Sequence, residues 1–200
     1  MGPVPDLDER ARACARRLGD ADGVLLASHI DADGLTSAAI AATALARAGI
    51  DHEVTFEKQL DAEAIAAIAD HEYDTALFTD FGSGQLDSIA EHEQAGDFVP
   101  VIADHHQPAD ATTEYHLNPL LVGIDGASEL SGAGTTYVLA RALADEVGVE
   151  TTEPGPDWGP AAETNRDLAA LAVVGAVGDM QATRGELTGT NREIVAEGIE

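Results

Sequence analysis

Short apolar segments alternate with helix-like segments along the first half of this chain, and this order constrains the fold more than any other feature. The apolar segments have the length of strands, and Ala-rich or amphipathic stretches separate them. In chain order, the expected strands and helices alternate at 24–27, 35–48, 52–56, 61–70, 75–79, 85–94 and 99–103. Alternation of this kind predicts an α/β domain, with a parallel sheet and helices on both of its faces.

The remaining segments are less regular. In chain order we expect a helix at 6–19, a loop at 107–129, a helix opening near 132–134, a Pro- and Gly-rich link at 153–160, and a helical segment from 164 that leads to a strand ending at Asp179. Residues 191–200 have the pattern of a helix that continues, so we expect this chain to be the N-terminal part of a longer protein. We predict one domain over residues 1–200, with its core at about 20–185.

Size and hydropathy indicate a soluble protein. The chain has 200 residues, of which 44% are apolar, and this is enough for one core. No apolar stretch approaches the ~20 residues that span a bilayer. The N-terminus lacks the basic-then-apolar order of a signal peptide, so we expect a cytoplasmic location and no contact with membranes.

The charge balance is strongly acidic. The chain carries 37 acidic and 10 basic side chains, which gives a net charge of −27. The acids are scattered through periodic segments, as on a surface adapted to the molar intracellular salt of halophilic archaea. Near 1 M salt the Debye length falls to ~3 Å, so charges act only at contact range. Metal ions and a few arginines could then bind a phosphodiester that the net charge would otherwise repel.

Ligand-type side chains stand where the first apolar run stops. His29, Asp31 and Asp33 follow this run at every second position, directly before Gly34. Extended residues two apart point to the same side, so we expect the three side chains to share one face of the strand tip. The alternative is that the two acids cap the following helix.

Other predicted strands end in the same way. Asp104, His105 and His106 follow the run at 99–103, Asp80 follows the run at 75–79, and Asp179 ends a later apolar run. Each acid alone could belong to a turn or an ordinary strand end. Together these oxygen and imidazole groups suffice for two divalent ions, and the oxygen-rich mixture favours Mn²⁺ or Mg²⁺. A pair of ions ~3.5–4 Å apart that share a carboxylate suits phosphoester hydrolysis.

Two further segments suggest anion binding. A helix that starts at Ser131, Gly132, Ala133 and Gly134 would offer backbone N–H groups to a phosphate, although a plain helix start needs no function. Arg184 and the segment 116–119 could reach the same cleft.

The motifs His29–Gly34, Asp80, Asp104–His106 and Gly178–Asp179 resemble, in order, the four motifs of the DHH phosphoesterases. Within that superfamily the chain is similar to the archaeal RecJ-like nucleases, in particular to the GINS-associated nuclease type. Segments 58–60, 79–84, 130–135 and 174–181 carry this resemblance, which spans roughly residues 10–200. It implies a Rossmann-like DHH domain. Family members also carry a C-terminal, substrate-binding domain with a glycine-rich motif, and no such domain follows within these 200 residues.

The resemblance implies a role for each motif residue. One ion would be held by His29, Asp31 and Asp80, and the other by Asp33, Asp80, His105 and Asp179, with Asp80 as the bridge. His106 would contact the scissile phosphate or the leaving group. Asp104 would orient His105 by a hydrogen bond, as acids behind metal-bound imidazoles do.

Three functions remain open at this point. The first is a Mn²⁺- or Mg²⁺-dependent exonuclease that acts on single-stranded DNA or RNA in replication or repair, with the GINS replication complex as a candidate partner. The second is a hydrolase of a small phosphoester, such as a short oligonucleotide, a cyclic dinucleotide or pyrophosphate. The third is a non-catalytic replisome subunit, and the complete ligand set argues against it.

Overall fold

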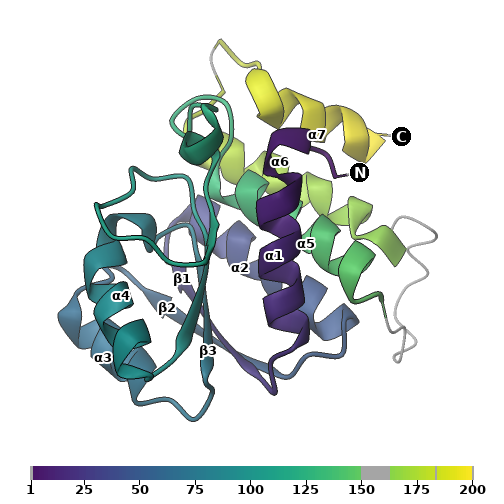
Figure 1. Cartoon of the computed structure of the whole chain (residues 1–200). Helices are drawn as coiled ribbons and strands as arrows, with labels where there is room; N and C mark the ends of the chain where they lie inside the picture. Colours follow the sequence, from purple (N-terminus) through teal and green to yellow (C-terminus); the bar gives the residue numbers. More distant parts are fainter. Residues whose placement is uncertain (1, 150–162, 183, 200) are drawn as a thin grey trace.

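A five-stranded parallel sheet forms the centre of the molecule, as predicted (Figure 1). The structure, a computed structural model, describes residues 2–149, 163–182 and 184–199. The strands lie in the order β2-β1-β3-β4-β5, and every neighbouring pair is parallel. Their bounds are β1 (Val24–His29), β2 (His52–Glu57), β3 (Thr75–Thr79), β4 (Val99–Ala103) and β5 (Tyr115–Leu117).

Helices cover both faces of the sheet (Figure 1). One face carries α1 (Asp8–Gly19), α2 (Ala32–Arg47) and α5 (Gly132–Glu146), and the other carries α3 (Ala62–Ala69) and α4 (Leu86–Ala95). Two further helices, α6 (Ala169–Gly178) and α7 (Gly189–Ile199), extend the first layer, where α6 contacts both α2 and α5. Short 3₁₀ turns occur at Pro5–Leu7, Ser83–Gln85, Pro119–Val122 and Arg166–Leu168.

Alternate residues of each strand serve the two cores. Leu26 and Leu77 pack beneath α1, α2 and α5, whereas their neighbours Leu25 and Phe78 pack beneath α3 and α4. Strands β1 and β3 are buried along their whole length except at His29. A strand that is apolar on both sides is what a parallel sheet between two helix layers requires.

The second half of the chain differs from prediction in two places. A fifth strand, β5, lies within the segment 107–129 that was predicted to be a loop. The prediction of a strand that ends at Asp179 is wrong, because the apolar run forms the helix α6 and Asp179 caps its C-terminus. The predicted link at 153–160 lies outside the described residues.

The strand order creates a switch point between β1 and β3. From β1 the chain continues to β2 at one side, and from β3 it continues to β4 at the other side. In open α/β sheets a crevice forms at such a point, beyond the carboxyl ends of the strands. The ligand-type residues that follow β1, β3 and β4 therefore meet around this crevice.

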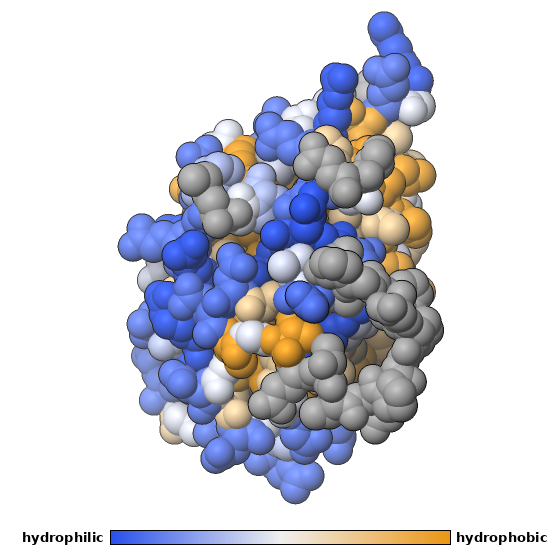
Figure 2. Space-filling model, turned by 90° about the vertical axis from the view of Figure 1, so that its right-hand side faces the viewer, coloured by the Kyte–Doolittle hydropathy of each residue, from blue (hydrophilic) through white to orange (hydrophobic). Residues whose placement is uncertain are grey.

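The surface is largely polar. Figure 2 shows a face on which hydrophilic residues dominate and apolar residues form smaller areas between them. Of the helices in the described ranges, none combines the length and hydropathy needed to span a bilayer.

Candidate metal centre

The first ligand-type side chains lie where β1 runs into α2. His29 ends the strand, and Asp31 caps the helix with its Oδ1, which accepts the backbone N–H of Gly34 at 2.9 Å. The other carboxylate oxygen of Asp31 lies 3.1 Å from Nδ1 of His29. Asp31 therefore caps the helix and faces the site at the same time, so the two alternatives do not exclude each other.

Asp33 points elsewhere. Helix α2 begins at Ala32 and places Asp33 in its first turn, where the side chain is buried. The expectation that His29, Asp31 and Asp33 share one face of an extended tip is therefore wrong. Burial raises the pKa of Asp33.

The N-terminus of α5 binds this carboxylate. The backbone N–H groups of Gly132 and Ala133 donate to the two oxygens of Asp33 at 2.7 and 3.0 Å. The N–H of Gly134 donates to Oγ of Ser131 at 3.2 Å. The structure thus differs from the expectation that this turn offers its N–H groups to a substrate phosphate, because protein oxygens already accept them.

Asp80 lies at the centre of the site. It follows β3 with a φ of 61°, and its side chain is 2% exposed. Its Oδ2 lies 3.8 Å from Nδ1 of His29, and its Oδ1 lies 3.3 Å from Nε2 of His105. Asp80 thus reaches imidazoles on both sides. A Cβ at Gly132 would overlap Oδ1 of Asp80, so glycine is needed for α5 to approach this closely.

His105 completes the buried part of the site. Its Nδ1 lies 2.7 Å from the carbonyl oxygen of Gly126, which directs Nε2 toward Asp33, Asp80 and Asp179. Burial opposes protonation of this ring, but the interactions with Asp80 and Gly126 raise the pKa of His105 to about 10. Burial, reinforced by the negative charge of Asp33, raises the pKa of Asp80 to about 8.

The described residues include three overlapping groups of possible metal ligands: one is Asp80, Asp104, His105 and His106, and the other two divide the predicted ligand set. The ligand atoms of His29, Asp31 and Asp80 lie within 4.8 Å of one another, and so do those of Asp33, His105 and Asp179. Asp80 connects the groups, because its two oxygens face His29 and His105. Several carboxylates around a buried imidazole need positive charge, and this donor set fits hard divalent cations such as Mn²⁺ and Mg²⁺.

A glutamine holds Asp179 in place. Nε2 of Gln181 donates to Oδ2 of Asp179 and to the carbonyl oxygen of Gly126, both at 2.8 Å. Nδ2 of Asn191 donates to Oε1 of Gln181 at 2.6 Å. Neither Gln181 nor Asn191 was among the predicted site residues, since an amide carries no ligand signal in the sequence.

Asp104 has a different role from the one expected. Its Oδ1 lies 2.8 Å from Nδ1 of His106, whereas its contact with His105 is with the backbone N–H, also at 2.8 Å. Asp104 thus orients the ring of His106, and the carbonyl of Gly126 orients the ring of His105. Burial of Asp104 opposes its ionisation, but the hydrogen bond from His106, the nearby imidazoles and the backbone N–H of Ser83 together outweigh burial and hold its pKa well below the usual range.

Comparison with known proteins agrees with this geometry. Residues 23–175 match the family model described as "DHH family, N-terminal domain". The chain belongs to the DHH family. An uncharacterized protein of Methanocaldococcus jannaschii is 31% identical over 209 residues, which cover 100% of this chain and 42% of that protein.

Solved structures share the fold of this DHH domain. A manganese-bound exonuclease RecJ has 24% identity and a TM-score of 0.74, over 100% of this chain and 49% of that one. RecJ from Thermus thermophilus in complex with Mn²⁺ has 24% identity and a TM-score of 0.70, over 98% and 27% of the two chains. CDC45 from Entamoeba histolytica has 14% identity and a TM-score of 0.52, over 95% and 35%. The chain thus spans less than half the length of these proteins.

A pocket of about 610 Å³ opens beside the candidate metal centre of the DHH domain. His29, Asp80 and His106 form its wall toward the ligand groups, and Lys58 is the one Lys or Arg among the described residues that line it. The remaining lining residues are Gln59, Leu60, Asp61, Phe81, Gly84, Gln85, Asp104 and Gln107. Of the two imidazoles that line this pocket within the described ranges, that of His106 is the more exposed.

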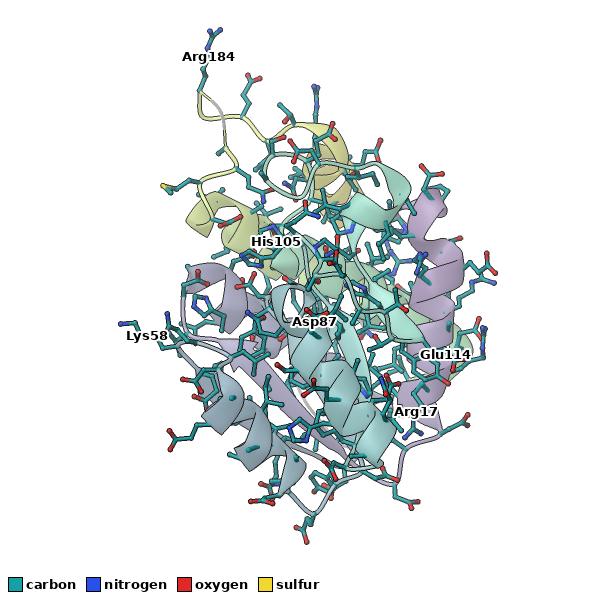
Figure 3. All side chains as sticks on the ribbon, turned by 60° about the vertical axis from the view of Figure 1, so that its left-hand side comes forward. Arg17, Lys58, Asp87, His105, Glu114 and Arg184 are labelled. Atoms are coloured by element: carbon teal, nitrogen blue, oxygen red, sulfur yellow. The ribbon has the colours of Figure 1, made fainter. Side chains whose placement is uncertain are left out.

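Two predicted contacts are not formed. Arg184 projects from the loop between α6 and α7, away from His105 (Figure 3), and it does not line the pocket. His116 and Asn118 are buried behind the loop of His106 and also do not line the pocket. None of the three reaches the cleft as expected.

Proposed function

We propose that this DHH domain binds two divalent ions, Mn²⁺ or Mg²⁺, and hydrolyses phosphodiester bonds. One ion is assigned to His29, Asp31 and Asp80, and the other to Asp33, Asp80, His105 and Asp179. The observation that carries this proposal is the position of Asp80, whose two oxygens face one imidazole of each ligand group. The chemistry that such a pair supplies when bound is activation of a water molecule and neutralisation of phosphoryl charge.

The residues of the chain contribute binding and proton transfer. The buried acids and His105 hold the site closed on the side of α5, and the pocket leaves the opposite side open to a phosphate group. Asp104 fixes the ring of His106 through Nδ1, so that Nε2 remains to contact the phosphate or to donate a proton to the leaving oxygen. The hydrogen bond to Asp104 is the largest influence on the pKa of His106 and raises it, which favours the proton-donating form.

Single-stranded DNA or RNA is our first choice of substrate, with exonucleolytic cleavage of the RecJ type. Support comes from the fold shared with a manganese-bound exonuclease RecJ. Replication or repair is the proposed setting, with the GINS complex as a partner, and the shared fold with CDC45 is compatible with it. The net charge of −27 supports a haloarchaeal source and work in a cytosol of molar salt.

One observation favours the second candidate, a small phosphoester. Among the described residues that line the pocket, Lys58 is the one Lys or Arg, whereas channels for single-stranded nucleic acid combine several basic and aromatic side chains. A short oligonucleotide, a cyclic dinucleotide or pyrophosphate would need fewer such contacts.

The deciding experiment compares substrates in high salt with Mn²⁺. End-labelled single-stranded DNA and RNA are incubated beside a dinucleotide and pyrophosphate. Progressive shortening from one end supports the exonuclease, and cleavage of only the small substrates replaces it with the second candidate. Absence of all cleavage, together with binding to GINS, would leave a non-catalytic replisome subunit. The Asp80→Asn variant controls for contaminating nucleases.

A further inference from the structure

Three polar side chains are buried behind His106, outside both ligand groups. Ser83 follows β3, His116 lies in β5 and Asn118 follows β5, and each of these side chains is at most 4% exposed. They neither line the pocket nor belong to a group of metal ligands. Their contacts connect the segment after β3 with the loop that carries the exposed imidazole.

Asn118 uses its whole amide group. Its Nδ2 donates to the carbonyl oxygen of His106 and to Oγ of Ser83, both at 2.9 Å. Its Oδ1 accepts the backbone N–H of Leu120 at 2.9 Å. An aspartate at this position would keep the acceptor and the size but would lose both donated hydrogen bonds.

Ser83 continues the connection to the acid that orients the ring. Its backbone N–H donates to Oδ2 of Asp104 at 2.9 Å. Its hydroxyl accepts from Asn118 and lies within hydrogen-bond distance of Nε2 of His116, 2.9 Å away. These two contacts hold the Ser83 hydroxyl between Asn118 and His116.

The two branches converge on one residue. One branch holds the backbone carbonyl of His106 through Asn118, and the other holds Asp104, whose Oδ1 lies 2.8 Å from Nδ1 of the same ring. Since the ring of His106 is half-exposed and lines the open pocket, these hydrogen bonds determine its position.

We propose that Asn118 and Ser83 are positioning residues for His106, which act through Asp104 and the loop backbone and never touch the substrate. This inference rests on the proposed function, because it assigns the ring of His106 to the phosphate or the leaving group. Where a hydrogen-bond partner orients a functional side chain, its loss lowers activity by roughly ten- to a hundredfold. The Asn118→Asp variant should lose this factor in kcat, with little change in KM or in Mn²⁺ affinity.

A matched control separates positioning from general destabilisation. Asn165 is also buried, and its Nδ2 donates to the carbonyl oxygen of Ala140 while its Oδ1 accepts from Arg47. The Asn165→Asp variant loses a buried donor in a part of the fold remote from His106. It should lower the unfolding temperature without lowering kcat. An equal loss of kcat in both variants would contradict the proposal.

A double-mutant cycle tests whether the effect passes through His106. In a His106→Gln background, Asn118→Asp should change kcat less than twofold. The same ten- to hundredfold loss in both backgrounds would overturn the proposal. If Asn118→Asp does not fold, the same cycle is run with Ser83→Ala. This variant removes the hydroxyl but keeps the N–H bond to Asp104, and it must show the same non-additivity.

Magnetic resonance tests the positioning without any turnover. The Nδ1–H of His106 that is bonded to Asp104 should give a downfield proton resonance, assigned by its loss in His106→Gln. Asn118→Asp should shift or abolish this resonance. An unchanged resonance overturns the positioning role. If the resonance changes as expected but the wild-type protein hydrolyses no substrate, only the proposed function is contradicted.

Discussion

Oδ1 of Asp80 lies 3.3 Å from Nε2 of His105, and neither of these buried atoms has a hydrogen bond to any other described group. Buried polar atoms are almost always satisfied, so an orphaned pair that faces the same point indicates a missing partner. Two further carboxylates, Asp33 and Asp179, lie 3.8 Å from the same nitrogen. A divalent cation held by these groups would satisfy all of them at once.

Asp80→Asn is expected to abolish both metal binding and activity. The amide keeps the shape of the side chain but removes the charge and one acceptor that the two ligand groups share. Wild-type protein at a hundredfold excess of Mn²⁺ over its dissociation constant should gain about 2.7 kcal/mol of stability. Thermal unfolding with and without Mn²⁺ measures this gain, and an Asp80→Asn protein that keeps it would exclude the bridging role.

Gly132→Ala is expected to weaken metal binding although it adds only a methyl group. The new Cβ would overlap Oδ1 of Asp80 and must displace either that side chain or the N-terminus of α5. Gly84→Ala is the matched control, because its nearest neighbour, the carbonyl oxygen of Gln107, is 3.9 Å from the added Cβ. Calorimetric titration with Mn²⁺ should show a weaker affinity only for Gly132→Ala. Equal affinities in the two variants would contradict the close approach.

The contribution of His116 to the stability of the metal-free protein should fall as the pH is lowered from 6.5 to 4. Burial lowers the pKa of His116 to about 4 from its ordinary value of 6.5, so below 6.5 the unfolded chain binds a proton that the folded protein rejects. The contribution is fully favourable above pH 6.5 and is lost progressively down to pH 4, by about 3 kcal/mol in total. Urea unfolding of wild type and His116→Gln across this range isolates this contribution: as the pH falls from 6.5 to 4, the free energy of unfolding of the wild type should fall relative to that of the variant. Parallel curves for the two proteins would show that His116 does not titrate as described.

Salt is expected to stabilise the fold. A net charge of −27 repels itself at low ionic strength, and molar salt screens this repulsion to contact range. The unfolding temperature should therefore rise by several degrees between about 0.1 M and about 3 M KCl, with most of the rise at the low end. A flat or falling curve would remove the physical basis for proposing a high-salt cytosol.

The sequence predicts the first half of the fold well, because β1, β3 and β4 are apolar runs that end in polar turn residues, and helical patterns separate the first four strands. It fails at β5, which has only three residues and no apolar pattern of its own. It also fails at Asp179, because a short apolar run does not distinguish a strand from a buried helix. Contacts of α6 with α2 and α5 decide that case.

The ligand-type residues were predictable, but their connections were not. His105 and His106 are neighbours in sequence, and no local pattern indicates which ring Asp104 orients. The N-terminus of α5 likewise resembles an anion site until Asp33, about a hundred residues earlier, occupies it. Residue types indicate the chemistry of a site, whereas the pairing of donors and acceptors depends on the tertiary fold.

The crystal structure of the protein grown with Mn²⁺, with anomalous scattering used to locate the metal, tests the central claim most directly. We expect two anomalous peaks ~3.5–4 Å apart, with one oxygen of Asp80 on each or one oxygen between them. His29 and Asp31 should bind the first ion, and Asp33, His105 and Asp179 the second. A single peak, or two peaks without Asp80 between them, would contradict the two-ion site.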